Sequence, residues 1–190
     1  MVSQLQNLPD GVLTRIDMHS SLDRVNYQIE SYARRSRVAD TSRHEAFEEL
    51  VMVKNLQVVS VDPELADSGP SKSLPVARYS VSIKPEMCSA IGQLHGAATA
   101  LIFDMTTSMA VAPKARKGFW EFHGVSRNLS ISYYRPVPVG SRVTIEARVV
   151  QIGNRFATIM AEMRDMNDEI LASAQHDKAQ VDPRARLAKM

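Results

Sequence analysis

Two groups that can take part in a reaction lie on one apolar stretch, residues 92–109. His95-Gly96 opens this stretch, and a single carboxylate, Asp104, interrupts it. Apolar residues on nearly every side predict a buried helix, and a lone carboxylate on a buried helix is costly to desolvate unless it has a partner. The first backbone N–H groups of such a helix lack intrahelical partners and lie at the positive end of its dipole. We interpret the combination as a reaction site; the alternative is a core helix whose Asp104 reaches solvent or an arginine.

Composition excludes several classes of partner. The 190 residues suit one domain plus an extension, and the formal net charge is only +2. Because no stripe of Lys and Arg with interleaved aromatics occurs, we expect no nucleic-acid partner. No apolar run approaches the length of a bilayer span, so we expect no membrane partner. The single cysteine, Cys88, fits a reducing compartment and predicts a cytoplasmic protein, while the terminal Ala188-Lys189-Met190 loosely resembles a peroxisomal address.

Periodicity divides the chain into an N-terminal helical extension (1–42), one domain (43–182) and a C-terminal tail (183–190). In the extension, Ser20 precedes an apolar stripe at helical spacing, which predicts a helix, and a second capping box at Ser42 predicts another. The long apolar helix is predicted at about residues 95–112. Strands are predicted at residues 55–61, 75–83, 125–134, 143–149, 157–161 and 170–178.

The order of these elements predicts an α+β fold. One apolar helix has strands before and after it in the sequence, and it is buried only if the sheet wraps around it. We therefore predict the hotdog fold, a curved antiparallel sheet around one long central helix. The last four strands are expected to form a meander.

Two segments carry a family resemblance. Residues 90–104, AIGQLHGAATALIFD, resemble the His-Gly-Gly…Asp signature of the hotdog-fold acyl-CoA thioesterases, in the PaaI-like and acyl-CoA thioesterase 13-like group. Gly124-Val125-Ser126, the alternating strand after it and Tyr133-Tyr134-Arg135-Pro136 resemble the next strand of that family. The resemblance covers about residues 75–180. It implies hydrolysis of an acyl-CoA or acyl-carrier-protein thioester, with coenzyme A as part of the substrate and no other cofactor.

The resemblance also implies a role for each motif residue. At Gly96 the missing side chain would let a thioester carbonyl place its developing oxyanion on the helix N-terminus, although close packing alone also explains a glycine. Asp104 would attack the thioester or activate a water. Ser126 would orient that carboxylate or water, and a surface-facing strand serine fits the same spacing. His95 would shape the turn rather than act as a base.

The spacing of Gly96 and Asp104 has a consequence for assembly. Eight residues of helix separate them, about 12 Å along the axis. Both groups therefore cannot reach one carbonyl from a single helix. If both are catalytic, Gly96 of one subunit must meet Asp104 of another, which predicts a homodimer or a tetramer.

Departures from the family pattern keep two alternatives open. Ala97 replaces the usual second glycine, and Ser89 stands where the family often has an amide side chain that holds the water or the substrate. A non-catalytic protein that binds acyl thioesters or lipids is therefore one alternative. The other is a hotdog dehydratase or hydratase, which typically pairs an Asp with a His, but no His is evidently placed with Asp104.

Contacts to coenzyme A are predicted from the basic and polar residues near strand ends. The predicted residues are Arg135, Asn154, Arg155 and Lys178. No glycine-rich phosphate loop occurs, so these contacts would be made at the surface. The histidines lack the spacing of zinc ligands, and we predict no metal.

Overall fold

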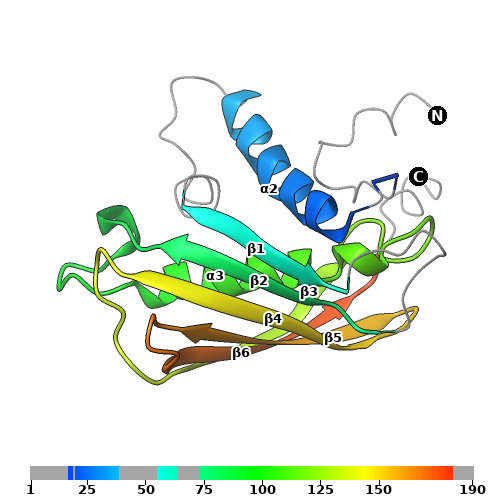
Figure 1. Cartoon of the computed structure of the whole chain (residues 1–190). Coiled ribbons are helices and arrows are strands. Elements are labelled where there is room, and N and C mark those ends of the chain that lie inside the picture. Colours follow the sequence, from blue (N-terminus) through cyan, green and yellow to red (C-terminus); the bar gives the residue numbers. More distant parts are fainter. Residues whose placement is uncertain (1–16, 19, 39–54, 64–72, 182–190) are drawn as a thin grey trace.

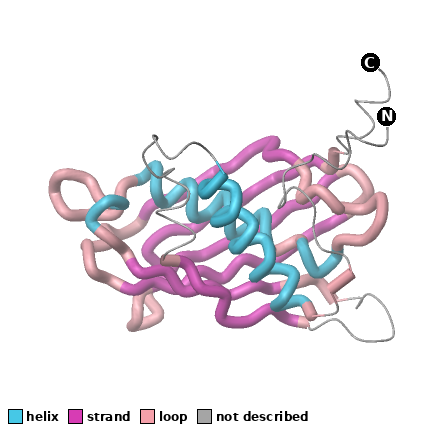
Figure 2. Tube along the Cα trace, turned by 90° about the horizontal axis from the view of Figure 1, so that it is seen from above, coloured by secondary structure: helices cyan, strands magenta, loops and turns pink. Residues whose placement is uncertain are grey.

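The computed structural model describes residues 17, 18, 20–38, 55–63 and 73–181. Within these ranges a single antiparallel sheet packs against a central helix, and a second helix lies against the first strand at one edge of the sheet (Figures 1 and 2). The elements are α2 (Ser21–Val38), β1 (Leu56–Asp62), β2 (Val76–Ser82), the 3-10 helix η2 (Pro85–Met87), α3 (Gly96–Met109), the 3-10 helix η3 (Ala112–Lys114), β3 (Val125–Tyr133), β4 (Arg142–Ile152), β5 (Phe156–Arg164) and β6 (Ile170–Ala179).

The sheet has six strands in the order β1-β2-β4-β5-β6-β3, each antiparallel to its neighbours. β4, β5 and β6 form a meander, but β3 does not join it. β3 pairs with β6 at the edge of the sheet opposite β1, and the chain then crosses the sheet to reach β4. The expected four-strand meander is therefore wrong in its first strand. β1 and β2, which precede α3 in the chain, therefore lie at one edge of the sheet, and β3, the first strand after α3, lies at the other edge.

α3 is the predicted apolar helix, and it lies along the concave side of the sheet (Figure 1). Its core-facing side chains, such as Ile102 and Phe103, are fully buried among strand residues that alternate inward and outward. The helix ends at Met109, earlier than expected, and Ala112–Lys114, which includes Pro113, forms the separate 3-10 helix η3. The fold is the predicted α+β arrangement.

α2 confirms the predicted helix of the N-terminal extension. Val25 is fully buried, and Arg24 extends to the segment after α3, where its Nη1 donates to the carbonyl oxygen of Ala115 at 2.9 Å. Ser21 Oγ donates to the carbonyl oxygen of Pro63, just after β1, at 3.1 Å. α2 therefore contacts both the segment that follows α3 and the β1 edge of the sheet. The helix predicted after Ser42 and the residues Ala188-Lys189-Met190 lie outside the described residues.

None of the helices in the described ranges is long and apolar enough to cross a lipid bilayer.

Candidate active site

The start of α3 presents an open backbone donor. His95 is the N-cap residue, and its Nδ1 accepts a hydrogen bond from the N–H of Ala97 at 3.1 Å. The histidine thus uses the second N–H of the helix. Within the described residues the N–H of Gly96 donates to no protein group. His95 shapes the helix start, and the N–H of Gly96 at the exposed end of the helix is available to an incoming oxygen.

Space at Gly96 does not explain why this residue is a glycine. A Cβ built there would lie 3.6 Å from the hydroxyl oxygen of Tyr133, an ordinary contact distance. That hydroxyl donates to the carbonyl oxygen of Gly96 at 3.1 Å. Close packing inside the chain is therefore no reason to exclude a methyl group at this position.

A cavity of about 340 Å³ opens beside Gly96. Its apolar part is formed by Val137, Met163 and Leu171, all buried in the core. Tyr134 and Arg135 stand on its rim and also line a second hollow, of about 830 Å³, on the outer face of the sheet. The open N–H of the helix therefore adjoins a partly apolar cavity of a size suited to a small organic group.

Asp104 lies two turns further along α3, and its side chain is 39% exposed. Ser126 Oγ donates to Asp104 Oδ1 at 3.1 Å. The structure thus brings these two predicted residues together. The carboxylate is held on one oxygen and remains accessible from outside the chain.

A β-bulge in β3 aims Ser126 at Asp104. The register between β3 and β6 shifts between Ser126 and Asn128, so Ser126 lies opposite Lys178 while Leu129 lies opposite His176. Lys178 and His176 both face α3, so the extra residue puts Ser126 on the same face as Leu129. Strict alternation would have put the two on opposite faces. The prediction of a regular period in this strand was therefore wrong at the position that matters for the site.

His176 is the site residue that sequence reasoning missed. The ring is fully buried, its Nε2 lies 2.9 Å from Ser126 Oγ and 3.6 Å from Asp104 Oδ1, and its Nδ1 lies 2.6 Å from Thr107 Oγ1. The expectation that no histidine accompanies Asp104 was wrong. The sequence feature that could have identified His176 is the alternation of β6, which places this residue on the same inward face as Ala172 and Ala174.

Both nitrogens of this ring make polar contacts. Burial and the neighbouring Lys178 lower the pKa of His176 to about 4, so the ring is neutral at pH 7. Thr107 Oγ1, 2.6 Å from Nδ1, also donates to the carbonyl oxygen of Phe103 at 2.6 Å, and Ser126 Oγ lies 2.9 Å from Nε2. The polar chain Thr107–His176–Ser126 therefore ends at the Asp104 carboxylate.

Lys178 also belongs to this cluster. Its side chain is 3% exposed, and its Nζ donates to Ser108 Oγ at 2.7 Å, while Ser108 Oγ donates to the Asp104 carbonyl oxygen at 2.6 Å. Burial lowers the pKa of Lys178 to about 8 against the opposing effect of Asp104. Lys178, which was predicted to contact coenzyme A at the surface, is instead buried and faces α3 from the inner side of β6.

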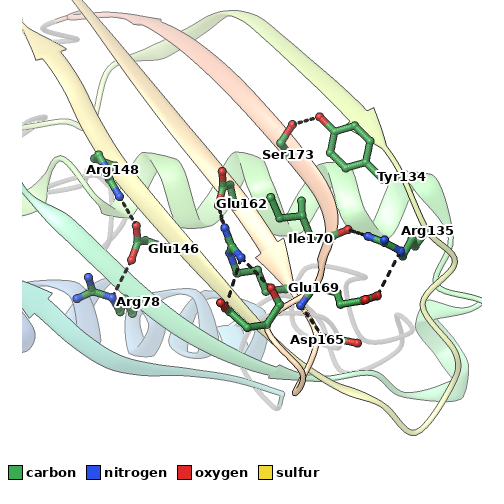
Figure 3. Close-up of polar contacts among 12 residues, drawn as sticks. Arg78, Tyr134, Arg135, Glu146, Arg148, Glu162, Asp165, Glu169, Ile170 and Ser173 are labelled. Carbon is green, nitrogen blue, oxygen red and sulfur yellow. Dashed lines mark hydrogen bonds and ion pairs between the residues drawn. The ribbon is translucent and has the colours of Figure 1, made fainter.

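The other predicted coenzyme A contacts lie at opposite ends of the chain's fold. Arg135 is near Gly96, where its Nη1 donates to the carbonyl oxygen of Ile170 at 2.9 Å and its Nε lies 3.3 Å from Glu169 (Figure 3). Asn154 and Arg155 are exposed at the turn between β4 and β5. That turn adjoins the end of β6 near Lys178, because the N–H of Gln180 donates to the carbonyl oxygen of Arg155 at 2.9 Å. One chain therefore does not gather these residues in one place.

Ser89 lies in the turn before α3 and is not joined to Asp104. Its hydroxyl donates to the carbonyl oxygen of Gln93 at 3.2 Å, within the turn itself. The hydroxyl thus supports the segment that leads into His95 and Gly96.

The chain is similar to known proteins in sequence and in fold. Residues 91–172 match the thioesterase superfamily. Acyl-coenzyme A thioesterase 13 of Homo sapiens is 25% identical over 138 residues, which are 72% of this chain and 93% of that protein. Zebra fish thioesterase superfamily member 2 has a structure that matches with a TM-score of 0.62 and 21% identity, over 83% of this chain and 96% of that chain. The PaaI protein of E. coli matches with a TM-score of 0.56 and 13% identity, over 83% of this chain and 94% of that chain.

Proposed function

We propose that this chain, which belongs to the thioesterase superfamily of hotdog-fold proteins, hydrolyses acyl-CoA or acyl-carrier-protein thioesters to the free acid. The observation that carries the proposal is that Asp104, an accessible carboxylate on the central helix, accepts a hydrogen bond from Ser126 on β3. The name of the human relative supports a coenzyme A thioester as the substrate.

Gly96 and Asp104 divide the reaction between them. The Gly96 N–H receives the carbonyl oxygen and stabilises the negative charge that develops on it. Asp104 either attacks the carbonyl carbon or takes a proton from a water that does so. Collapse of the tetrahedral intermediate breaks the C–S bond and releases the thiolate. In the first case water then hydrolyses the anhydride formed with Asp104; in the second the acid is released at once.

The site is formed between two subunits in this proposal. Gly96 and Asp104 begin and nearly end α3, and the 12 Å or so between them is too long for one carbonyl. The position of β3 favours the binding of a second copy of the chain along this strand. β3 forms an edge of the described sheet, and its residues Val125 and Tyr133 are about half exposed. A nine-residue edge strand with an unpaired side is a surface that proteins usually cover.

The hydratase alternative is disfavoured by the environment of His176. That ring is the histidine near Asp104, but both its nitrogens are engaged, by Thr107 and by Ser126, and the side chain is fully buried. It therefore has no free nitrogen for proton transfer at a substrate carbon. Purified protein incubated with crotonyl-CoA should yield crotonate and free CoA, with no hydrated thioester.

The test of the reaction is the substitution Asp104→Asn. The purified protein and the variant are assayed for thiol release from acetyl-, hexanoyl-, lauroyl- and benzoyl-CoA and from hexanoyl-carrier protein. We expect turnover on at least one of these substrates and a loss of 100-fold or more in Asp104→Asn, which should keep the circular dichroism spectrum of the folded wild type. Asp168→Asn, on an exposed turn where a positive φ suits Asn, is the matched control. Unchanged turnover in Asp104→Asn would exclude the role given to this residue, and binding without product would favour a thioester-binding protein.

A mixing experiment tests the shared site. Gly96→Val and Asp104→Asn are each expected to be inactive, and they are mixed in equal amounts under conditions that exchange subunits. Half of the dimers are then mixed, and one of the two sites in each joins an intact Gly96 to an intact Asp104, so about one quarter of the wild-type activity should return. If both residues act from the same chain, the mixture stays inactive.

A further inference from the structure

The loop of residues 115–124, which leads into β3 directly before Ser126, has a strained backbone. Four of its residues have positive φ angles between 54° and 73°: Gly118, Trp120, His123 and Gly124. Trp120 and His123 carry full side chains, for which a left-handed backbone is unfavourable. A conformation of this kind persists only where the surrounding contacts hold it in place. The 115–124 loop therefore depends on the elements that pack against it.

Two elements hold this loop from different sides. The indole N–H of Trp120, a fully buried residue, donates at 2.7 Å to a carbonyl oxygen of the turn between β4 and β5. From α2, Nε2 of the fully buried Gln28 is hydrogen-bonded to Nε2 of His123. One turn earlier on α2, Arg24 donates to the carbonyl oxygen of Ala115 at 2.9 Å. α2 therefore contacts the loop at its beginning and near its end.

The end of the loop lies in close contact with β6. At Gly124 a Cβ would lie 2.4 Å from the carbonyl oxygen of Ala179, so this position requires a glycine. Val125 then pairs with Ala179, and the register between β3 and β6 shifts directly after Ser126. Only Val125 and Ser126 therefore lie between the strained loop and the bulge. Because two residues of strand pairing constrain this segment weakly, the loop must help to fix its direction.

We propose that Gln28 and His123 are positioning residues, through which α2 fixes the start of β3 and directs the Ser126 hydroxyl at the Asp104 carboxylate. Ser126 Oγ donates to Asp104 Oδ1 at 3.1 Å, so a small shift of the segment lengthens this bond beyond its useful range. The catalytic consequence rests on the proposed function, whereas the structural part rests on the contacts between α2 and the loop. α2 thus takes part in arranging the site as well as in covering the sheet edge.

The test removes the contact between α2 and the loop from either side. Gln28→Leu keeps most of the side-chain volume but loses the hydrogen bond. His123→Asn keeps a residue that tolerates a positive φ but shortens the side chain, and it replaces Gln28→Leu if that variant does not fold. Ser21→Ala is the matched control. It removes another hydrogen bond of α2, the one that Ser21 Oγ donates to the carbonyl oxygen of Pro63 next to β1.

Hydrogen exchange reports on the start of β3 without a substrate. Mass spectrometry follows a peptic fragment covering residues 120–128 in the wild type and in each variant. This fragment should exchange about 10-fold faster in Gln28→Leu and His123→Asn than in the wild type, because local opening of the segment becomes easier. Ser21→Ala should exchange like the wild type in this fragment. Exchange that is equal in all of these proteins, or equally fast in the control, would overturn the inference.

Kinetic measurements on the same proteins separate the inference from the proposed function. With a CoA ester that the wild type hydrolyses, kcat should fall about 10-fold in Gln28→Leu and His123→Asn while KM changes less than about two-fold, because the contact orients reacting groups and binds no substrate. Ser21→Ala should keep the kcat of the wild type. Unchanged kcat in the two variants, or an equal loss in the control, would count against the inference. Faster exchange in both variants of an inactive protein would overturn the proposed function and leave the placement of Ser126 by α2 intact.

Discussion

Replacing Lys178 by methionine should stabilise the protein while it damages the site. Burial lowers the pKa of Lys178 from its ordinary 10.5 to about 8. Because each pKa unit corresponds to about 1.4 kcal/mol, the charged side chain makes the folded state about 3 kcal/mol less stable than a neutral one would. The lost hydrogen bond to Ser108 offsets about 1 kcal/mol of this gain. A net gain of about 2 kcal/mol should raise Tm by roughly 4–8 °C in a chain of this length.

The pH dependence distinguishes this effect from better packing. Below pH 8 the lysine is charged in both the folded and the unfolded chain, and its full penalty applies. Between pH 8 and 10.5 the folded protein loses the proton first, so the stability of the wild type rises relative to the variant. Urea unfolding at pH 7 and at pH 10 should therefore show the advantage of Lys178→Met shrinking at the higher pH. A variant less stable than the wild type at pH 7, or an advantage that is the same at both values, would refute the reasoning.

Three further predictions follow from individual contacts. Gly96→Ala should leave the free energy of unfolding within about 0.5 kcal/mol of the wild type, since the new methyl group meets only ordinary contacts. The same variant should lower kcat/KM for thioester hydrolysis at least 10-fold. Activity equal to that of the wild type would show that no substrate carbonyl approaches Gly96. His176 is held neutral with its pKa lowered to about 4, so the wild type should lose stability as the pH falls from 6.5 towards 4, and His176→Gln should lose less over that range in urea titrations. Arg24→Ala leaves the carbonyl oxygen of Ala115 without its donor and should lower Tm by roughly 4–8 °C, a cost of about 2 kcal/mol.

Most of the elements could be predicted from the sequence, because hydrophobic period depends on local residues alone. The apolar helix predicted at 95–112 appears as α3, although it ends at Met109, and the alternation in β4, β5 and β6 appears as expected. The position of β3 could not be predicted in this way. Two antiparallel neighbours, β4 and β6, were open to it, and the choice between them depends on closing the sheet around α3.

The candidate site could be predicted on the central helix and, through the family resemblance, at Ser126. Asp104 was singled out because it conflicts with the apolar character of α3, and Gly96 because it begins that helix. Ser126 required a bulge to face the helix, and a bulge changes the face of a strand without a sequence signal as clear as a glycine or a proline. His176 and Lys178 reach Asp104 only across the packing of β6 on α3, which no local pattern contains.

Two costly buried groups lie beside one carboxylate. A buried lysine and a buried neutral histidine each reduce stability, and an apolar residue would cost less at each position. His176 lies 3.6 Å from Asp104 Oδ1, and Lys178 is joined to the Asp104 backbone through the Ser108 hydroxyl group. Their common neighbour is an argument for chemistry at this position, and it predicts that variants which relieve these two costs gain stability and lose turnover together.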